Sequence, residues 1–469
     1  MSTIPQTETK NHQTEKKIRD FFRKVKIGSL LRESNIRKDR GVSALALFQY
    51  LFALVLMPQS HYQNMSSRVN KPFAKDAVYR YLNEGRFHWE KFLLRLAEKV
   101  ISLIVALDDP CRKMSLIVDD TIFERSRSKA VELIGKVFDH SDGLFKRGFY
   151  MLTVAWSDGS SVVPCMFRMV AAAKKHLYCP AQTGMDRRTI AARRREKAQQ
   201  TKPEMVLEML TQIADRGILA QHVLMDSWFA LPELLAQVHA LGFAPLVMLK
   251  RMNWRCYRYK APSWAQPRHL TLQELYFATR QGQREPIYAV HVSLKSPLGY
   301  TAVKITFTMP NSILSKNKRA KDWAALLTTD LTLSAQEMVR LYGRRWGIET
   351  MFQECKEDLL LAKEFYTQSL DATIASATIV LTRYICLAFS RRYDVDPRAW
   401  GDLFMACCEE LADLSYQEAL HLLILSLTDS LSLLLGIDKH FLQVSISSVF
   451  SSSAPFSISP FPNFLPTIS

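Results

Sequence analysis

The sequence predicts a mixed α/β protein, in which helices flank a mixed sheet, a β-rich insertion interrupts it and a helical domain precedes it. Three observations support this fold class. The pattern is helical up to about residue 107 and changes at Met114, where the apolar and β-branched run MSLIV starts a first strand. Residues 149–170 form two strand patterns joined by Asp-Gly, which is typical of a hairpin. Strand and helix patterns then alternate through residues 222–250.

These patterns divide the chain into segments with different expected structures. They are 1–20, disordered; 21–110, a helical DNA-binding domain; 111–250, the first part of the core; 251–322, the β-rich insertion; 323–366, the rest of the core; 367–440, a helical C-terminal region; and 441–469, a disordered Ser/Pro-rich tail. Within the first domain, residues 74–83 form a short basic helix that suits DNA contact and simple packing equally well.

The most apolar run, residues 42–57, bears on whether the chain enters a membrane. It is shorter than the ~20 residues that a spanning helix needs, and it contains Gln49. We therefore expect a buried helix and no membrane partner. The eight cysteines include no CxxC pair, which favours reduced thiols in an intracellular protein.

The chain is strongly basic, which indicates a polyanionic partner. Its 62 Lys and Arg against 45 Asp and Glu give a formal net charge of +17 and a pI near 9.5. The basic residues cluster most densely in residues 187–202, and those expected to bind DNA are Arg187, Arg188, Arg193, Arg194, Arg195 and Lys197. This run is predicted to follow the DNA backbone and to set affinity without reading sequence. The alternative is a solvated charged helix.

Residues 341–361 contain the most informative pattern in the chain. Tyr342, Arg345, Glu349 and Lys356 lie in a stretch without proline, where a helix is predicted. At ~3.6 residues per turn, the four side chains fall within an arc of roughly 60°. A carboxylate beside two cations and a phenol suits a metal ion held next to a phosphate.

Further carboxylates come from the predicted strands. Asp119 and Asp120 are expected to end the first core strand, and Asp226 a later one. With Glu349 they offer three carboxylates from three separate elements, as two-metal phosphoryl transfer requires. An aspartate at a strand end is also common as a helix cap, so each of these residues alone carries little weight.

Together these motifs resemble the DDE transposases of bacterial insertion sequences, in the insertion-sequence-four type family with the signature Y-(2)-R-(3)-E-(6)-K. The signature stands at Tyr342, Arg345, Glu349 and Lys356 with its spacing intact. DDT at residues 119–121 and DSWFA at residues 226–230 resemble the two aspartate motifs of that family. The three motifs occur in the expected order, with a long insertion before the glutamate.

The resemblance implies an RNase H-like core, with Mg²⁺ as cofactor and Mn²⁺ as a substitute. Carried over, Asp120, Asp226 and Glu349 correspond to the catalytic metal-binding triad. Tyr342, Arg345 and Lys356 correspond to the phosphate-contacting set. Asp119 and Asp120 both precede Thr121, and strand alternation allows only one of them to reach the metals. We expect Asp120, because the family usually has the catalytic residue directly before a small or hydroxyl residue.

The tryptophans divide into core and DNA-contact candidates. Trp228 and Trp346 are expected to pack in the core, whereas Trp254 lies among arginines of the insertion. The resemblance suggests that Trp254 stacks on a base displaced from the duplex, with Trp264 as a rival and core packing as the plain alternative.

The predicted function is therefore a DNA transposase that cuts the ends of an insertion sequence and joins them to target DNA. Expected partners are double-stranded terminal repeats and target DNA, bound by a homodimer in a synaptic complex. The expected location is the bacterial cytoplasm, with the nucleoid. The alternatives are a metal-dependent DNA nuclease without strand transfer and a catalytically silent, transposase-derived DNA-binding protein.

Overall fold

A computed structural model describes most of the chain up to residue 393. The described residues are 17–55, 61, 73–74, 76–107, 112–128, 130–140, 142–280, 287–308, 323–365 and 367–393. Most of the predicted N-terminal disordered segment, the predicted Ser/Pro-rich tail and the C-terminal region after residue 393 lie outside the described residues.

The N-terminal part of the chain is helical. Residues 17–24 are helical, and α2 (Ile27–Glu33), α3 (Ala44–Leu54), α5 (Asp76–Leu82) and α6 (Trp89–Val105) follow. The Ser43 hydroxyl starts α3 by accepting a hydrogen bond from the backbone N–H of Ala46 at 3.2 Å. Most side chains of α3 are buried, which confirms the buried helix predicted from the apolar run.

Helix α5 covers most of the short basic segment that suited either packing or DNA contact. Its apolar side chains, including Val78 and Tyr81, are buried in the helical domain. Arg80 is exposed and pairs with Asp76 at 2.9 Å, one turn earlier on the same helix. Packing therefore accounts for one face of α5, while DNA contact by the other face stays a prediction.

One large mixed sheet runs through the molecule. Its strands are β1 (Ser115–Glu124), β2 (Gly135–Asp139), β3 (Leu144–Ser157), β4 (Val162–Val170), β5 (His222–Met225), β6 (Ala244–Met248), β7 (Tyr257–Tyr259), β8 (Arg268–Leu270), β9 (Ile287–Ser296), β10 (Gly299–Thr308) and β11 (Ala324–Thr328). The order is β2-β3-β1-β5-β6-β11-β10-β9-β7-β8, and β4 pairs with β3.

The middle of this sheet has the directions that matter for the site. Strand β1 is antiparallel to β3 and parallel to β5, and β5 is parallel to β6. The hairpin of β3 and β4 confirms the Asp-Gly hairpin predicted from the sequence. This mixed arrangement is consistent with a DDE or RNase H-like core. The first strand differs from its prediction, because β1 continues past Asp119 and Asp120 to Glu124.

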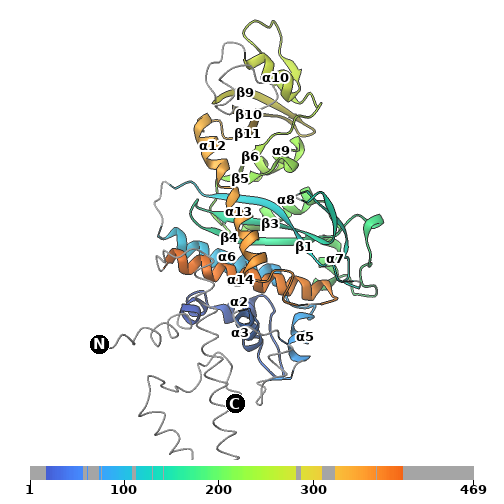
Figure 1. Ribbon diagram of the computed structural model, residues 1–469. Helices are drawn as coiled ribbons and strands as arrows, with labels where there is room; N and C mark the ends of the chain where they lie inside the picture. The colour runs from blue at the N-terminus through green and yellow to red at the C-terminus, as the bar shows by residue number, and fades with distance from the viewer. Residues whose placement is uncertain are drawn as a thin grey trace, which may run out of the picture.

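Helices cover the sheet, and some of them carry site residues. They are α7 (Ile190–Lys197), α8 (Lys202–Asp215), α9 (Pro232–Ala240), α10 (Leu272–Arg280), α12 (Ala335–Gly343), α13 (Trp346–Glu357) and α14 (Leu370–Tyr393), with the short 3₁₀ helices η1 (Lys174–His176) and η2 (Ser227–Phe229). In Figure 1, the orange-red α14 and the blue α6 lie side by side beneath the sheet, and α2, α3 and α5 lie below α14.

Helix α14 is unusually apolar. By length and composition its residues 370–392 could cross a membrane, with a mean hydropathy of 1.6. However, 89% of its most apolar window is buried inside the fold, against α6, α3 and β4. Its apolar surface is thus covered by protein, which is the arrangement of a core helix.

The predicted β-rich insertion contributes to the same sheet. Within residues 251–322 the structure describes the strands β7, β8, β9 and β10, and a helix, α10, that the sequence pattern did not predict. Strand β10 pairs antiparallel with β11, and β11 pairs with β6 of the core. The insertion strands extend away from the N-terminal helices, at the top of Figure 1.

Candidate active site

Asp119 and Asp226 follow two adjacent parallel strands at the same step. The last paired residues of β1 and β5 are Val118 and Met225, and the two aspartates come next. Asp226 keeps an extended backbone and begins the 3₁₀ helix η2, where its Oδ1 accepts a hydrogen bond from Trp228 N at 2.9 Å. Side chains at the same step of neighbouring parallel strands point to the same face. Asp119 therefore shares the face of Asp226, and Asp120 points away.

The signature residues lie on two helices instead of one. Helix α12 ends at Gly343 and α13 begins at Trp346, so the predicted continuous helix is interrupted by a two-residue turn. Within the turn, Arg345 N donates to Tyr342 O at 3.0 Å, and Ile348 N donates to Arg345 O at 3.2 Å. These tighter i→i−3 bonds change the direction of the chain at Arg345.

Arg345 lies between two carboxylates. Its Nη1 is 2.7 Å from Asp119 Oδ2, and its Nη2 donates to Glu349 Oε1. The side chains of Arg345, Asp119 and Glu349 are 13%, 16% and 35% exposed, so this bridge is partly shielded from solvent. The guanidinium Nε is buried and has no hydrogen-bond partner within the described part of the chain.

Burial and neighbouring charges shift the ionisation of these groups. Burial raises the pKa of Asp119 to about 7, although the Arg345 cation opposes that shift, and Asp226 and Asp120 add to it. Burial also raises the pKa of Tyr342 to about 12, so this phenol is protonated at neutral pH. Asp226 and Asp119 are both among the charges that act on Tyr342. The structure thus brings Asp119, Asp226, Tyr342, Arg345 and Glu349 into one electrostatic cluster.

Asp120 lies outside this cluster, on the opposite face of β1. Its carboxylate pairs with Lys202, the first residue of α8. The Lys202 ammonium also lies 4.0 Å from the ring centroid of Tyr150 and 4.8 Å from that of Trp228. The geometry therefore corrects the expectation for Asp120, because strand alternation turns this residue away from Arg345 and Glu349.

Lys356 is separated from the other signature residues. The charges that act on it are those of Asp139, Lys146 and Glu124, near the far end of β1, while burial lowers its pKa. Because β1 continues for five residues beyond Asp119, helix α13 carries Lys356 along the strand and away from the aspartates. Of the predicted stripe of four side chains, Tyr342, Arg345 and Glu349 thus stay together, and Lys356 is separated by the length of α13.

The carboxylates have the right chemistry for a divalent cation, but their present spacing does not suit one. Oxygen donors are what Mg²⁺ prefers. In the described residues, however, no group of three or more His, Cys, Asp and Glu side chains is close enough to hold a metal ion. The guanidinium of Arg345 contacts the oxygens of Asp119 and Glu349 that a metal ion would need.

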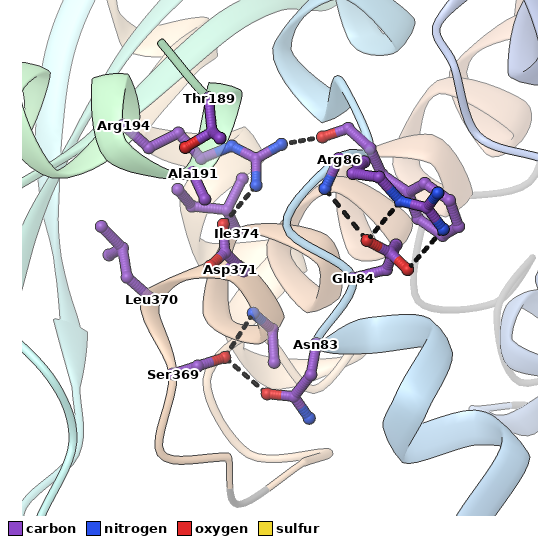
Figure 2. Close-up of polar contacts among 12 residues, drawn as sticks. Asn83, Glu84, Arg86, Thr189, Ala191, Arg194, Ser369, Leu370, Asp371 and Ile374 are labelled. Atoms are coloured by element: carbon purple, nitrogen blue, oxygen red, sulfur yellow. Dashed lines mark hydrogen bonds and ion pairs between the residues drawn. The ribbon is translucent and has the colours of Figure 1, made fainter. Parts of the chain in front are cut away.

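The basic run on α7 divides into buried and exposed arginines. Arg194 contacts the carboxylate of Asp371 and the carbonyl of Phe87, and Figure 2 shows its guanidinium pointing toward α14. Arg195 lies 2.6 Å from Glu132 Oε1 and 2.9 Å from Asp371 Oδ2. Both side chains are less than a tenth exposed. The prediction that Arg194 and Arg195 bind DNA is therefore corrected, because their charges face inward and are paired.

The other members of the run remain accessible. Arg187, Arg188 and Arg193 are exposed, and Arg188 pairs with Asp186 at 2.8 Å on the surface. Lys197 is half-buried and lies 3.2 Å from Glu90 Oε2, so its charge is partly compensated. Three arginines are thus left as DNA-contact candidates in this run.

The tryptophans near the site are more exposed than predicted. Trp228 and Trp346 were expected in the core, but they are 42% and 65% exposed. Trp254 is 45% exposed and lines a hollow with Trp228, Met252 and Lys250. This hollow also includes Ser227, the residue directly after Asp226. Its rival Trp264 is half-buried against Tyr259, with ring centroids 5.9 Å apart. Of the two candidates, Trp254 is the one that faces this hollow.

A signal for Asp119 was present in the sequence. Two four-residue apolar strands, SLIV and HVLM, are each followed at once by aspartate. Parallel pairing in register then places Asp119 beside Asp226, without reference to any family. Lys202 carried no such signal, because its contact with Asp120 depends on how α8 packs.

Comparison with known proteins gives one family. The family described as DDE superfamily endonuclease matches residues 36–283, which is more than half of the 469 residues. No curated protein matches the chain. The matched region includes Asp119 and Asp226 and ends before Glu349. The chain belongs to the DDE superfamily endonuclease family.

Proposed function

We propose that this protein is a DNA transposase of the insertion-sequence-four type, which cuts the ends of its element and joins them to target DNA. The observation that carries the proposal is the register of β1 and β5, which presents Asp119 and Asp226 on the face where Arg345 and Glu349 lie. DDE superfamily membership supports nuclease chemistry. Strand transfer and the YREK family rest on the spacing of the signature residues.

In this proposal Asp119, Asp226 and Glu349 are the catalytic carboxylates, and Asp119 takes the place expected for Asp120. Mg²⁺, or Mn²⁺ in its place, would supply Lewis-acid activation of water and of the leaving oxygen. The carboxylates place negative charge on one face of the sheet, from the middle of β1, from the residue after β5 and from α13. Tyr342, protonated at neutral pH, donates a hydrogen bond to a phosphate oxygen, and Arg345 offers a charge-assisted one.

The proposed partners are terminal-repeat DNA and target DNA, bound by a homodimer within a synaptic complex. The net charge of +17 and the exposed Arg187, Arg188 and Arg193 support a DNA backbone as the main electrostatic partner. The proposed location is the bacterial cytoplasm, with the nucleoid, where such DNA is found. Lys356, beside β2 and the end of β1, would contact a phosphate further along the duplex.

The test is an assay of purified full-length protein with supercoiled DNA that carries the sequences flanking its gene. With Mg²⁺ we expect nicks at the element ends, followed by joining of the new 3′ ends to a second labelled duplex. Asp226→Asn is the matched inactive control. Nicking without joining would favour the alternative of a nuclease that only hydrolyses DNA. DNA binding without nicking would favour a silent DNA-binding protein.

A further inference from the structure

Arg345 occupies the position between two of the proposed metal ligands. Its guanidinium contacts Asp119 Oδ2 at 2.7 Å and also Glu349 Oε1. A single protein cation thereby pairs with two carboxylates that a metal-dependent nuclease would keep for its metal ion.

A divalent cation and this guanidinium cannot use the same oxygens together. The Arg345 side chain is only 13% exposed, so little solvent is present to screen two adjacent positive charges. Metal ions also need direct oxygen coordination at about 2.0–2.1 Å for Mg²⁺. Direct coordination of a metal ion by Asp119 Oδ2 or Glu349 Oε1 therefore requires Arg345 to leave that oxygen.

The guanidinium also has unused bonding capacity. Arg345 Nε is buried and has no hydrogen-bond partner within the described part of the chain, although its two terminal nitrogens are bonded. A buried donor without an acceptor is unfavourable. A phosphodiester oxygen would supply both an acceptor and a negative charge, and guanidinium matches phosphate in a bidentate geometry.

We propose that Arg345 keeps divalent cations out of the free protein, and that a DNA phosphate draws it away so that metal ions bind only with DNA in place. The inference rests on the proposed function and adds a form of regulation to it. Arg345 is a positioning residue here, since it acts through Asp119 and Glu349. Free protein would then not cleave DNA before a phosphate reaches the site.

Linkage makes this proposal quantitative. If DNA raises metal affinity by some factor, metal must raise DNA affinity by the same factor. Typical couplings between sites correspond to roughly 5- to 150-fold. Removing the Arg345 charge should therefore tighten metal binding to the free protein within that range, and should abolish most of the additional effect of DNA.

The experiment measures Mn²⁺ binding to the full chain by electron paramagnetic resonance of the free ion, so its readout is independent of cleavage. The variants are wild type, Arg345→Gln and, as a charge-matched control, Arg344→Gln. Arg344 is the neighbouring residue and donates to the carbonyl of Lys113 instead of a site carboxylate. We expect Arg345→Gln to bind Mn²⁺ roughly 5- to 150-fold more tightly than wild type, and Arg344→Gln to match wild type.

A second arm adds a duplex carrying the DNA end that flanks the gene. Mn²⁺ bound by the DNA alone and by Asp226→Asn protein with DNA gives the background. Wild type with DNA should bind more Mn²⁺ than this background, whereas adding DNA to Arg345→Gln should increase its Mn²⁺ affinity little. If Arg345→Gln does not fold, Arg345→Met serves instead, because it has no positive charge to hold either carboxylate and should exclude Mn²⁺ less well.

Equal Mn²⁺ affinity of free wild type and a folded Arg345 variant would overturn the inference. That result leaves the proposed function intact if the wild type still nicks its DNA ends. Absence of nicking by wild type would instead count against the proposed function. The two failures can therefore be told apart.

Discussion

Asp119 and Asp226 stand at the same step of two neighbouring parallel strands, one residue after the pair formed by Val118 and Met225. Asp119 lies within β1, and Asp226 directly follows the last residue of β5, so both are held next to the sheet. Rigid strands hold functional groups more accurately than loops do. Their position places Asp119, and not Asp120, on the face of Asp226, because successive residues of a strand face opposite sides.

The first prediction compares these two aspartates. Asp119→Asn should lower the rate of Mg²⁺-dependent nicking by more than about 100-fold. A residue that only orients a metal ligand typically accounts for about 10- to 100-fold, so a larger loss indicates a ligand. Asp120→Asn should retain nicking, because Asp120 pairs with Lys202 on the other face of β1. Gel assays of supercoiled DNA measure both, with DNA binding checked by mobility shift. Loss of nicking in Asp120→Asn alone would reverse the assignment.

The second prediction concerns the stability that Arg194 contributes. Arg194→Ala leaves the Asp371 carboxylate with one cation fewer in a buried network, as Figure 2 shows around α14. Removing one partner of a buried ion pair typically costs about 3–5 kcal/mol of unfolding free energy. Urea denaturation followed by circular dichroism checks the change. Arg193→Ala is the matched control, and this exposed neighbour should stay within about 0.5 kcal/mol of wild type.

The third prediction concerns DNA affinity and salt. Replacing the exposed Arg187 and Arg193 together by Ala should weaken binding and reduce the slope of log affinity against log salt by up to ~0.9 for each lost phosphate contact. Fluorescence anisotropy with a labelled duplex at several salt concentrations measures the slope. The same slope in variant and wild type would place this surface away from DNA.

The fourth prediction concerns Trp254, which lines the hollow beside Trp228. If it stacks on a base displaced at the cut end, Trp254→Ala should lose hairpin formation while first-strand nicking continues. An aromatic ring recovers about 1–3 kcal/mol of stacking per base, so Trp254→Phe should retain part of the hairpin product. Denaturing gels separate nicked from hairpin DNA. Equal loss of both products, with lower thermal stability, would mean that Trp254 only packs.

The fifth prediction is a pH effect at Glu354 on α13. Burial raises its pKa to about 7; Asp358 adds to the shift, and Arg391 of α14 opposes it. Its Oε2 is buried and has no hydrogen-bond partner within the described residues. Because the folded pKa lies above the ordinary value of 4.5, the folded state prefers the protonated acid, and stability falls as pH rises through about 7.

Glu354→Gln removes that ionisation and keeps the shape of the side chain. The melting temperature of the variant should therefore match wild type near pH 4, below the ordinary pKa of 4.5, and exceed it by roughly 2–4 °C at pH 8. Differential scanning fluorimetry across this pH range provides the measurement. A difference that is constant with pH would show that Glu354 ionises normally in the folded protein.

Several strands and helices of the core could be predicted from the amino-acid sequence, because periodicity and turn residues are local signals. The hairpin of β3 and β4 and the buried helix α3 followed from such signals. The break at Arg345 did not, since good helix formers flank it and tertiary contacts with Asp119 fix its conformation. Charge clustering likewise could not distinguish Arg193 from Arg194, because burial depends on what α14 places opposite each residue.

Exposed tryptophans illustrate the same limit. Large aromatic residues are usually buried, and this tendency favoured a core position for Trp228 and Trp346. Both lie beside residues of the proposed site and remain accessible to a partner. A single sequence does not reveal such exceptions, because hydropathy describes a residue and not the surface on which it lies.

The continuity of the sheet has a mechanical consequence. The loop that carries Trp254 leaves the sheet after β6 and re-enters it at β7, five strand spacings from β5 in the order β5-β6-β11-β10-β9-β7. Tyr257 of β7 nevertheless lines the same hollow as Trp228, so strands far apart in the order of the sheet meet beside the residues that follow Asp226. The insertion therefore helps to form the surface next to the proposed site, and a change in how β7 is held would alter that hollow.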